Sequence, residues 1–358
     1  MKRCLVSVVS KQTLPNYLLI KELEESTERF LFISSKKMER EKKTADLAVT
    51  AGIPKDKMLK VLIEEDQYFR AHERLDKLHL PADTEYIVNL TGGTKLMAIA
   101  VREYFERFPN VRFFYVPLDK NTYKEIHDDR LADERPFTYR ISVAEYLSIY
   151  GMRGEPSERL FNERQVLELY KDVRSTGYEL ERFPLKKLKK YIPPYKITKQ
   201  MYTKWFEEYL YYRIKGILRL EDRFIATGLK LYSKLPLAPG ENRSSHQNDN
   251  EVDIFFLYKN RPYIVENKFS LGKREVNIDA LVHALFKMSG VNRRFGLNVY
   301  ATLATLSDLD ELTPDARRHL RHRCRILGLH YPIDRNDIHY RFGDRLRDFI
   351  EKREAVDS

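Results

Sequence analysis

EYIVNLTGGTKLM, residues 85–97, decides the fold of the first part of the chain. The apolar run Tyr86–Leu90 predicts a buried β-strand, and the amphipathic spacing that starts at Lys95 predicts a helix. The two glycines between them allow a tight strand-to-helix connection. Strands and helices alternate in this way over about the first 145 residues. We therefore expect an α/β fold with a doubly wound parallel sheet, in which ligands bind at the C-terminal ends of the strands.

The expected elements of this first part follow from hydrophobic periodicity. The strands are Cys4–Val9, Phe30–Ser34, Met58–Ile63, Tyr86–Leu90 and Arg112–Pro117. The helices between them are Asn16–Glu25, Lys37–Ala51, Asp66–Leu78 and Lys95–Phe108.

The segment Thr91–Lys95 has the composition of an anion site. Glycines allow close backbone approach, and the following helix N-terminus presents N–H donors. Its spacing matches neither GxxxxGK[ST] nor GxGxxG, which disfavours a Walker loop and a dinucleotide cofactor. The crossover after the first strand, which contains Ser10, Gln12 and Asn16, lies at the same expected crevice. The alternative is a tight connection capped by a threonine.

Charge is distributed unevenly along the chain. Residues 1–150 hold 25 Lys+Arg and 24 Asp+Glu, whereas residues 151–358 hold 39 and 29. The excess of positive charge in the second part favours a polyanionic partner such as nucleic acid. The double proline Pro193–Pro194 follows the basic run Lys186–Lys190 and marks a boundary. We expect domains at 1–146 and 197–358, joined by a helical connector over 147–196.

The second domain is expected to be α/β with a mixed sheet. The pattern predicts a polar loop between its first two strands, at Gly240–Asn250. The helices are Lys199–Leu218 and Ile278–Met288, and the strands are Phe224–Tyr232, Val252–Tyr258, Tyr263–Lys268 and Leu297–Leu303.

The segment EVDIFFLYKNRPYIVENKF, residues 251–269, reads as a hairpin around Lys259–Asn260. With a two-residue loop, Asp253 faces Glu266, and strand alternation places Lys268 on the same side. Opposed carboxylates destabilise a strand pair unless a cation lies between them. Oxygen ligands suit Mg²⁺ or Mn²⁺, and Lys268 would orient water or stabilise a phosphorane. The alternative is two surface carboxylates on an edge hairpin, one of them paired with Lys268. Asn267, between Glu266 and Lys268, is expected on the opposite face.

The preceding helix offers a further carboxylate. Glu207 and Glu208 are both candidates for an additional metal ligand, and the alternative is two solvated helix glutamates. Four basic residues around the following helix are candidate substrate contacts: Lys273, Arg274, Arg293 and Arg294.

The two motifs together resemble a known combination. NLTGGTK after a strand, with SxQxxPN after the first strand, resembles the CARF domain, and the D…ExK hairpin resembles the restriction-endonuclease-like PD-(D/E)xK fold. The resemblance to this nuclease class favours Glu207, through the spacing of Phe206, Glu207 and Leu210. The family's usual proline before the aspartate is absent, because Val252 stands there. Over its whole length the chain is similar to the CARF–PD-(D/E)xK ancillary nucleases of type III CRISPR systems.

That resemblance implies a homodimer activated by a cyclic oligoadenylate, with cyclic tetra-adenylate expected first. It implies cleavage of single-stranded RNA and DNA, or nicking of duplex DNA. By position, the ligand would contact Ser10, Gln12, Asn16, Asn89, Thr91, Gly92, Gly93, Thr94 and Lys95.

Two other function classes fit parts of the sequence. A ligand-gated, DNA-binding transcription regulator would explain the basic second part but not the clustered carboxylates. An enzyme that degrades the cyclic nucleotide in its own CARF pocket is the third class. Two distant cysteines and the lack of a long apolar run lead us to expect a cytoplasmic protein without a disulfide or membrane span.

Overall fold

The computed structural model describes residues 2–118, 120–178, 201–233, 251–269, 276–292, 295–296 and 299–351. The chain divides into two compact units; Met1–Arg153 forms the body of the first, and the second begins at Gly154. Several predicted features lie outside the described residues: the basic run Lys186–Lys190, the double proline, the loop Gly240–Asn250, and the candidate substrate contacts Lys273, Arg274, Arg293 and Arg294. None of the described helices has the length and apolar character that crossing a bilayer requires.

The first unit contains a seven-stranded sheet in the order β3-β2-β1-β4-β5-β6-β7. Its first five strands run parallel, as predicted, and β6 and β7 are antiparallel additions. The strands are β1 (Lys2–Val8), β2 (Arg29–Ser34), β3 (Met58–Leu62), β4 (Thr84–Asn89), β5 (Val111–Tyr115), β6 (Thr122–Ile126) and β7 (Asp133–Pro136).

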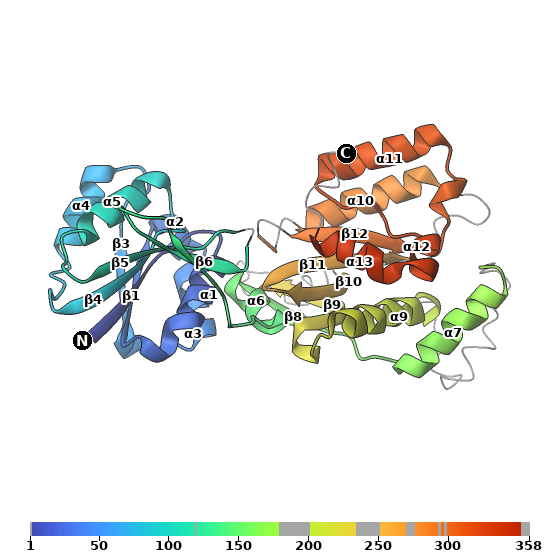
Figure 1. Ribbon diagram of the computed structural model, residues 1–358, viewed down its shortest axis with the longest axis horizontal. Helices are drawn as coiled ribbons and strands as arrows, with labels where there is room; N and C mark the ends of the chain where they lie inside the picture. The colour runs from blue at the N-terminus through green and yellow to red at the C-terminus, as the bar shows by residue number, and fades with distance from the viewer. Residues whose placement is uncertain are drawn as a thin grey trace, which may run out of the picture. The chain divides into compact units, whose positions relative to one another are not determined.

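Helices cover both faces of this sheet (Figure 1), which confirms the doubly wound prediction. α4 and α5 pack together on one face, and α1, α3 and α6 contact one another on the other. The helices are α1 (Leu14–Leu23), α2 (Lys36–Arg40), α3 (Lys43–Ala51), α4 (Tyr68–Asp76), α5 (Lys95–Phe105) and α6 (Val143–Ile149).

One predicted helix, Lys37–Ala51, is wrong as a single element. The chain forms α2 and α3 instead, because Lys42 between them adopts a left-handed conformation with φ of 57°. A residue with left-handed backbone dihedral angles interrupts a right-handed helix.

The second unit has a mixed five-stranded sheet in the order β12-β11-β10-β9-β8. β9, β10 and β11 are antiparallel, and β11 pairs with β12 in parallel. The mixed sheet was predicted. The strands are β8 (Met152–Glu155), β9 (Ile225–Ser233), β10 (Glu251–Tyr258), β11 (Arg261–Lys268) and β12 (Tyr300–Thr305).

The helices of this unit lie on both faces of its sheet (Figure 1). α9 and α7 pack together, and the apolar face of α9 shares a core with the inward side chains of β10 and β11. α10 contacts β12 and α11. The helices are α7 (Glu163–Ser175), α9 (Met201–Leu218), α10 (Ile278–Asn292), α11 (Pro314–Leu327), α12 (Arg335–Tyr340) and α13 (Phe342–Glu351).

Candidate functional site

Two buried asparagines anchor the loop that carries the TGGTK motif. The Nδ2 of Asn89, at the end of β4, donates to Oδ1 of Asn16 at 2.7 Å, and Asn16 donates to the Val8 carbonyl at 2.8 Å. Oδ1 of Asn89 in turn accepts from the backbone N–H and the hydroxyl of Thr91. Both asparagines are at most 1% exposed. Their amides therefore join the ends of β1 and β4 and hold the loop, rather than lining an open surface.

The two glycines are required by β1. A Cβ on Gly92 would lie 1.9 Å from the carbonyl oxygen of Val8, and one on Gly93 would lie 2.5 Å from a Val8 methyl. Gly93 also has φ of +76°, a region that side chains rarely adopt. This close approach of the loop to β1 explains the glycines without reference to a ligand.

The rest of the motif is accessible at the start of α5. Gly93, Thr94 and Lys95 are exposed. The Thr94 side chain accepts from the Met97 N–H and so caps the helix. Thus the threonine cap of the alternative interpretation is present, and Lys95 is the exposed first residue of the 11-residue helix. An anion is favoured at such a position.

The first crossover adds a partly exposed edge. Ser10 donates to the Gln12 carbonyl at 3.2 Å, and the Tyr150 hydroxyl donates to Oε1 of Gln12 at 3.3 Å. Ser10 and Gln12 are half-buried. They share the carboxyl edge of the parallel sheet with the TGGTK loop, as β1 and β4 are neighbours.

The hairpin forms in the predicted register. Tyr258 pairs with Arg261, and the pairing continues to Ile254 with Val265, so Asp253 and Glu266 come next in line. Lys259 and Asn260 both have positive φ, 50° and 59°, as a two-residue turn of type I′ requires. Glu266 and Lys268 lie on one face, with Oε1 to Nζ at 3.1 Å.

Asp253 lies in a strained electrostatic position. Burial and the charges of Glu266 and Glu207 raise its pKa well above the usual range. The N–H of Asn267, at 2.7 Å from Oδ2, and the charge of Lys268 lower the pKa of Asp253. A carboxylate opposed by two others is a position that a divalent cation stabilises. The donor set is all oxygen, which fits Mg²⁺ or Mn²⁺.

Glu207 approaches this group from α9. It is 6% exposed, and burial raises its pKa. Its Oε1 accepts from Lys204 Nζ at 2.6 Å and from the hydroxyl of Thr227 on β9. Thus a protein cation already pairs with this carboxylate.

Glu208 is committed elsewhere. Its two oxygens accept the backbone N–H groups of Leu160 and Phe161, each at 2.8 Å. The side chain is fully buried and holds the segment before α7 against α9. Between the two helix carboxylates that the sequence left open, the geometry favours Glu207 as a metal ligand.

Sequence reasoning missed Glu251. It is exposed, and it lies two residues before Asp253, so it projects from the same face of β10. Its charge contributes to the raised pKa of Glu207. The period-two spacing of Glu251 and Asp253 was the available signal.

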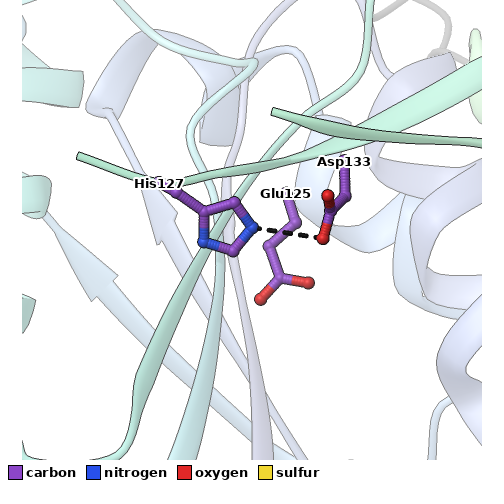
Figure 2. Close-up of side chains that lie close together, drawn as sticks. All are labelled: Glu125, His127 and Asp133. Atoms are coloured by element: carbon purple, nitrogen blue, oxygen red, sulfur yellow. Dashed lines mark hydrogen bonds and ion pairs between the residues drawn. The ribbon is translucent and has the colours of Figure 1, made fainter. Parts of the chain in front are cut away.

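Within the described residues, the predicted acids do not converge to metal-sharing distance. The group whose ligand atoms lie within 4.8 Å of one another is Glu125, His127 and Asp133. Figure 2 shows the His127 ring directed at Asp133, with Nε2 to Oδ2 at 3.3 Å, and Glu125 beside them. All three come from β6, β7 and their connection.

Arginines dominate the surroundings of this second group. Arg112 binds both oxygens of Glu125 at 2.7 Å, and Arg135 lies 3.8 Å from the same carboxylate. Arg130 lies 3.1 Å from Nε2 of His127. A metal would have to compete with three guanidinium groups, so we interpret this cluster as an ion-pair network that fixes the β6–β7 hairpin.

Comparison with known proteins places the first unit in a family. Residues 4–146 match the family model described as the Card1 CARF domain. The first unit is therefore a Rossmann-like CARF domain, and it is followed by a domain with a mixed sheet. A search of curated protein sequences returned no match.

Solved structures share the fold over nearly the whole chain. Can2 from Sulfobacillus thermosulfidooxidans, solved with cyclic tetra-adenylate, is 18% identical with a TM-score of 0.70, covering 98% of this chain and 100% of Can2. Protein VC1899 from Vibrio cholerae is 14% identical with a TM-score of 0.68, covering 97% and 98%. A type III CRISPR defence DNA nuclease activated by cyclic oligoadenylate is 17% identical with a TM-score of 0.58, covering 85% of this chain and 45% of that one.

Proposed function

We propose that this CARF-containing chain is a metal-dependent nuclease of type III CRISPR antiviral defence, switched on by a cyclic oligoadenylate. Residues 1–146 would sense the ligand, 147–196 would connect, and 197–358 would cleave. The observation that supports the proposal is the hairpin register, in which Asp253 comes opposite Glu266, with the charges of Glu266 and Glu207 close enough to raise the pKa of Asp253. A structural hairpin gains nothing from such mutual repulsion.

Asp253 and Glu266 would hold Mn²⁺ or Mg²⁺, with Glu207 and Glu251 as further carboxylates. The bound cation would polarise a phosphodiester and lower the pKa of a water ligand. Lys268 lies 3.1 Å from Glu266 and is 33% exposed at its side chain. Its ammonium would stabilise negative charge that develops on the phosphoryl oxygens.

The activator would bind at the carboxyl edge of the first sheet. The exposed Gly93, Thr94 and Lys95 at the N-terminus of α5 are suited to a phosphodiester. Ser10, Gln12 and Thr91 would complete the pocket, and Asn16 and Asn89 would support it from beneath. Cyclic tetra-adenylate is the first candidate, since Can2 was solved with it. Two CARF domains of a homodimer would share one ligand.

The substrate would be single-stranded RNA and DNA, or duplex DNA that is nicked. The decisive assay mixes the protein with Mn²⁺, each cyclic oligoadenylate in turn, and labelled single-stranded RNA, single-stranded DNA or supercoiled plasmid. We expect cleavage that requires both the metal and one cyclic oligoadenylate. Ligand-dependent DNA binding without cleavage in any combination would contradict the nuclease and favour a transcription regulator.

A further inference from the structure

A cavity of about 640 Å³ lies at the outer edge of the second sheet. β12 is the terminal strand of that sheet, and its Thr302 lines the cavity. Thr302 pairs with Val265, the residue before Glu266. The cavity is therefore one strand removed from β11, and the Thr302 side chain lies on the opposite face of the sheet from Glu266 and Lys268, because successive residues of a strand alternate between faces.

Arginines of α11 form one wall of this cavity. The helix carries five arginines against one acid, Asp315. Arg317, Arg318, Arg321 and Arg325 line the cavity, as the spacing i, i+1, i+4, i+8 of one helix face allows, whereas Arg323 does not. Thus part of the positive charge of the second domain is gathered into one concave site.

The opposite wall holds its own charges in pairs. Asp337, at most 6% exposed at its side chain, binds Arg341 at 2.7 Å and Arg345 at 3.0 Å. On the α11 wall, Arg317 binds Asp310 at 3.1 Å and Arg318 binds Asp315 at 3.0 Å. These pairs neutralise much of the charge on both walls.

Arg321 differs from these arginines. Its guanidinium carbon lies 5.4 Å from the centroid of the Tyr331 ring, and among the residues that the structure describes it has no carboxylate partner. The side chain is exposed at the cavity. A guanidinium held over an aromatic ring keeps its donors available for an anion, and phosphate matches their planar geometry.

We propose that this cavity binds the phosphodiester backbone of a single-stranded nucleic acid, with Arg321 as the principal phosphate contact. Arg317, Arg318 and Arg325 also line the cavity. Arg317 and Arg318 are paired with Asp310 and Asp315, so they add less positive potential than Arg321 does. The inference rests on the proposed nuclease function and gives the path of the substrate beyond the carboxylate site. The nucleic-acid strand would cross the edge strand β12 toward α11.

The test measures binding, not cleavage. Labelled oligothymidylate and labelled oligouridylate are titrated in EDTA with the full-length protein, and fluorescence anisotropy is recorded over a range of salt concentrations. We expect Arg321→Ala to weaken binding about five- to tenfold and to reduce the salt slope by about one. Arg323→Ala, which removes the same charge from the same helix outside the cavity, should change affinity less than twofold. The relative loss on the two probes tells whether DNA or RNA is preferred.

Equal losses for Arg321→Ala and Arg323→Ala would overturn the proposal, since they would show a diffuse charge effect. No binding of either probe by the wild type would overturn it as well. Thermal unfolding of both variants controls for folding. If Arg321→Ala alone weakens binding but the wild type never cleaves, the cavity assignment stands and the nuclease function falls. If the wild type cleaves and Arg321→Ala binds the probes as tightly as the wild type, the nuclease function stands and the cavity assignment falls.

Discussion

The two candidate sites differ in how their polar groups are satisfied. At the carboxyl edge of the first sheet, Asn16 and Asn89 are buried, and each amide has protein partners. At the hairpin of the second sheet, Asp253 faces two other carboxylates and its pKa is raised. Buried amides whose hydrogen bonds are all made hold a loop in place with little loss of folding free energy. A buried carboxylate that is repelled by two others lowers stability, and such groups are common at functional sites, where a bound cation removes the repulsion. The first site therefore has a fixed loop geometry, whereas the second has carboxylates that repel one another.

The largest expected effect separates the two sites by function. Glu266→Ala should reduce cleavage by about 10³-fold or more, because the proposed metal ligand is lost, while cyclic tetra-adenylate binding is unchanged.

Lys95→Ala should raise the activator concentration needed for half-maximal cleavage by about tenfold and leave the rate at saturation unchanged. Cleavage assays and calorimetric titration of the ligand check both. Loss of ligand binding in Glu266→Ala would contradict the division of roles.

The second effect concerns folding of the first unit. Gly92→Ala places a methyl group 1.9 Å from the Val8 carbonyl, and a β1 backbone atom cannot yield as a side chain does. We expect a loss of about 2–4 kcal/mol in the free energy of unfolding. Gly343→Ala, in α13 with no atom within 4 Å of the added Cβ, is the matched control. Far-UV circular dichroism follows both units, and the single tryptophan, Trp205, reports the second. Equal stability of the two variants would refute the account of the TGGTK glycines.

Sequence predicts these two regions unequally. The hairpin was predictable pair by pair, because a two-residue loop and a period of two fix every partner from Tyr258–Arg261 onward. The parallel sheet was predictable from strand–helix alternation. The role of the glycines was not, since it depends on Val8, more than 80 positions away in the sequence.

The helix carboxylates show the same limit. Glu207 and Glu208 have almost the same local sequence, and only tertiary partners separate them. Glu208 meets the N–H groups of Leu160 and Phe161, which no local spacing indicates. By contrast Lys204 stands one helical turn from Glu207, so that pair was visible as an i,i+3 spacing. The β6–β7 hairpin with Glu125, His127 and Asp133 was not predicted at all, because its strands are short and carry many charges.

The smallest effect tests the repulsion itself. Asp253→Asn should stabilise the metal-free protein by about 1 kcal/mol at neutral pH, since it removes a charge opposed by Glu266 and Glu207 and keeps an oxygen for the Asn267 N–H. The folded-state pKa of Asp253 is raised, so its favourable contribution is present below the unfolded pKa and is lost as pH rises through the folded pKa. The difference between wild type and variant should thus shrink at acid pH.

Saturating Mn²⁺ should raise the unfolding temperature of the wild type and not of the variant. Asp315→Asn, an exposed change on α11, should leave both responses as in the wild type; if Asp253→Asn behaves like Asp315→Asn, the carboxylates do not repel and the hairpin has no need of a metal.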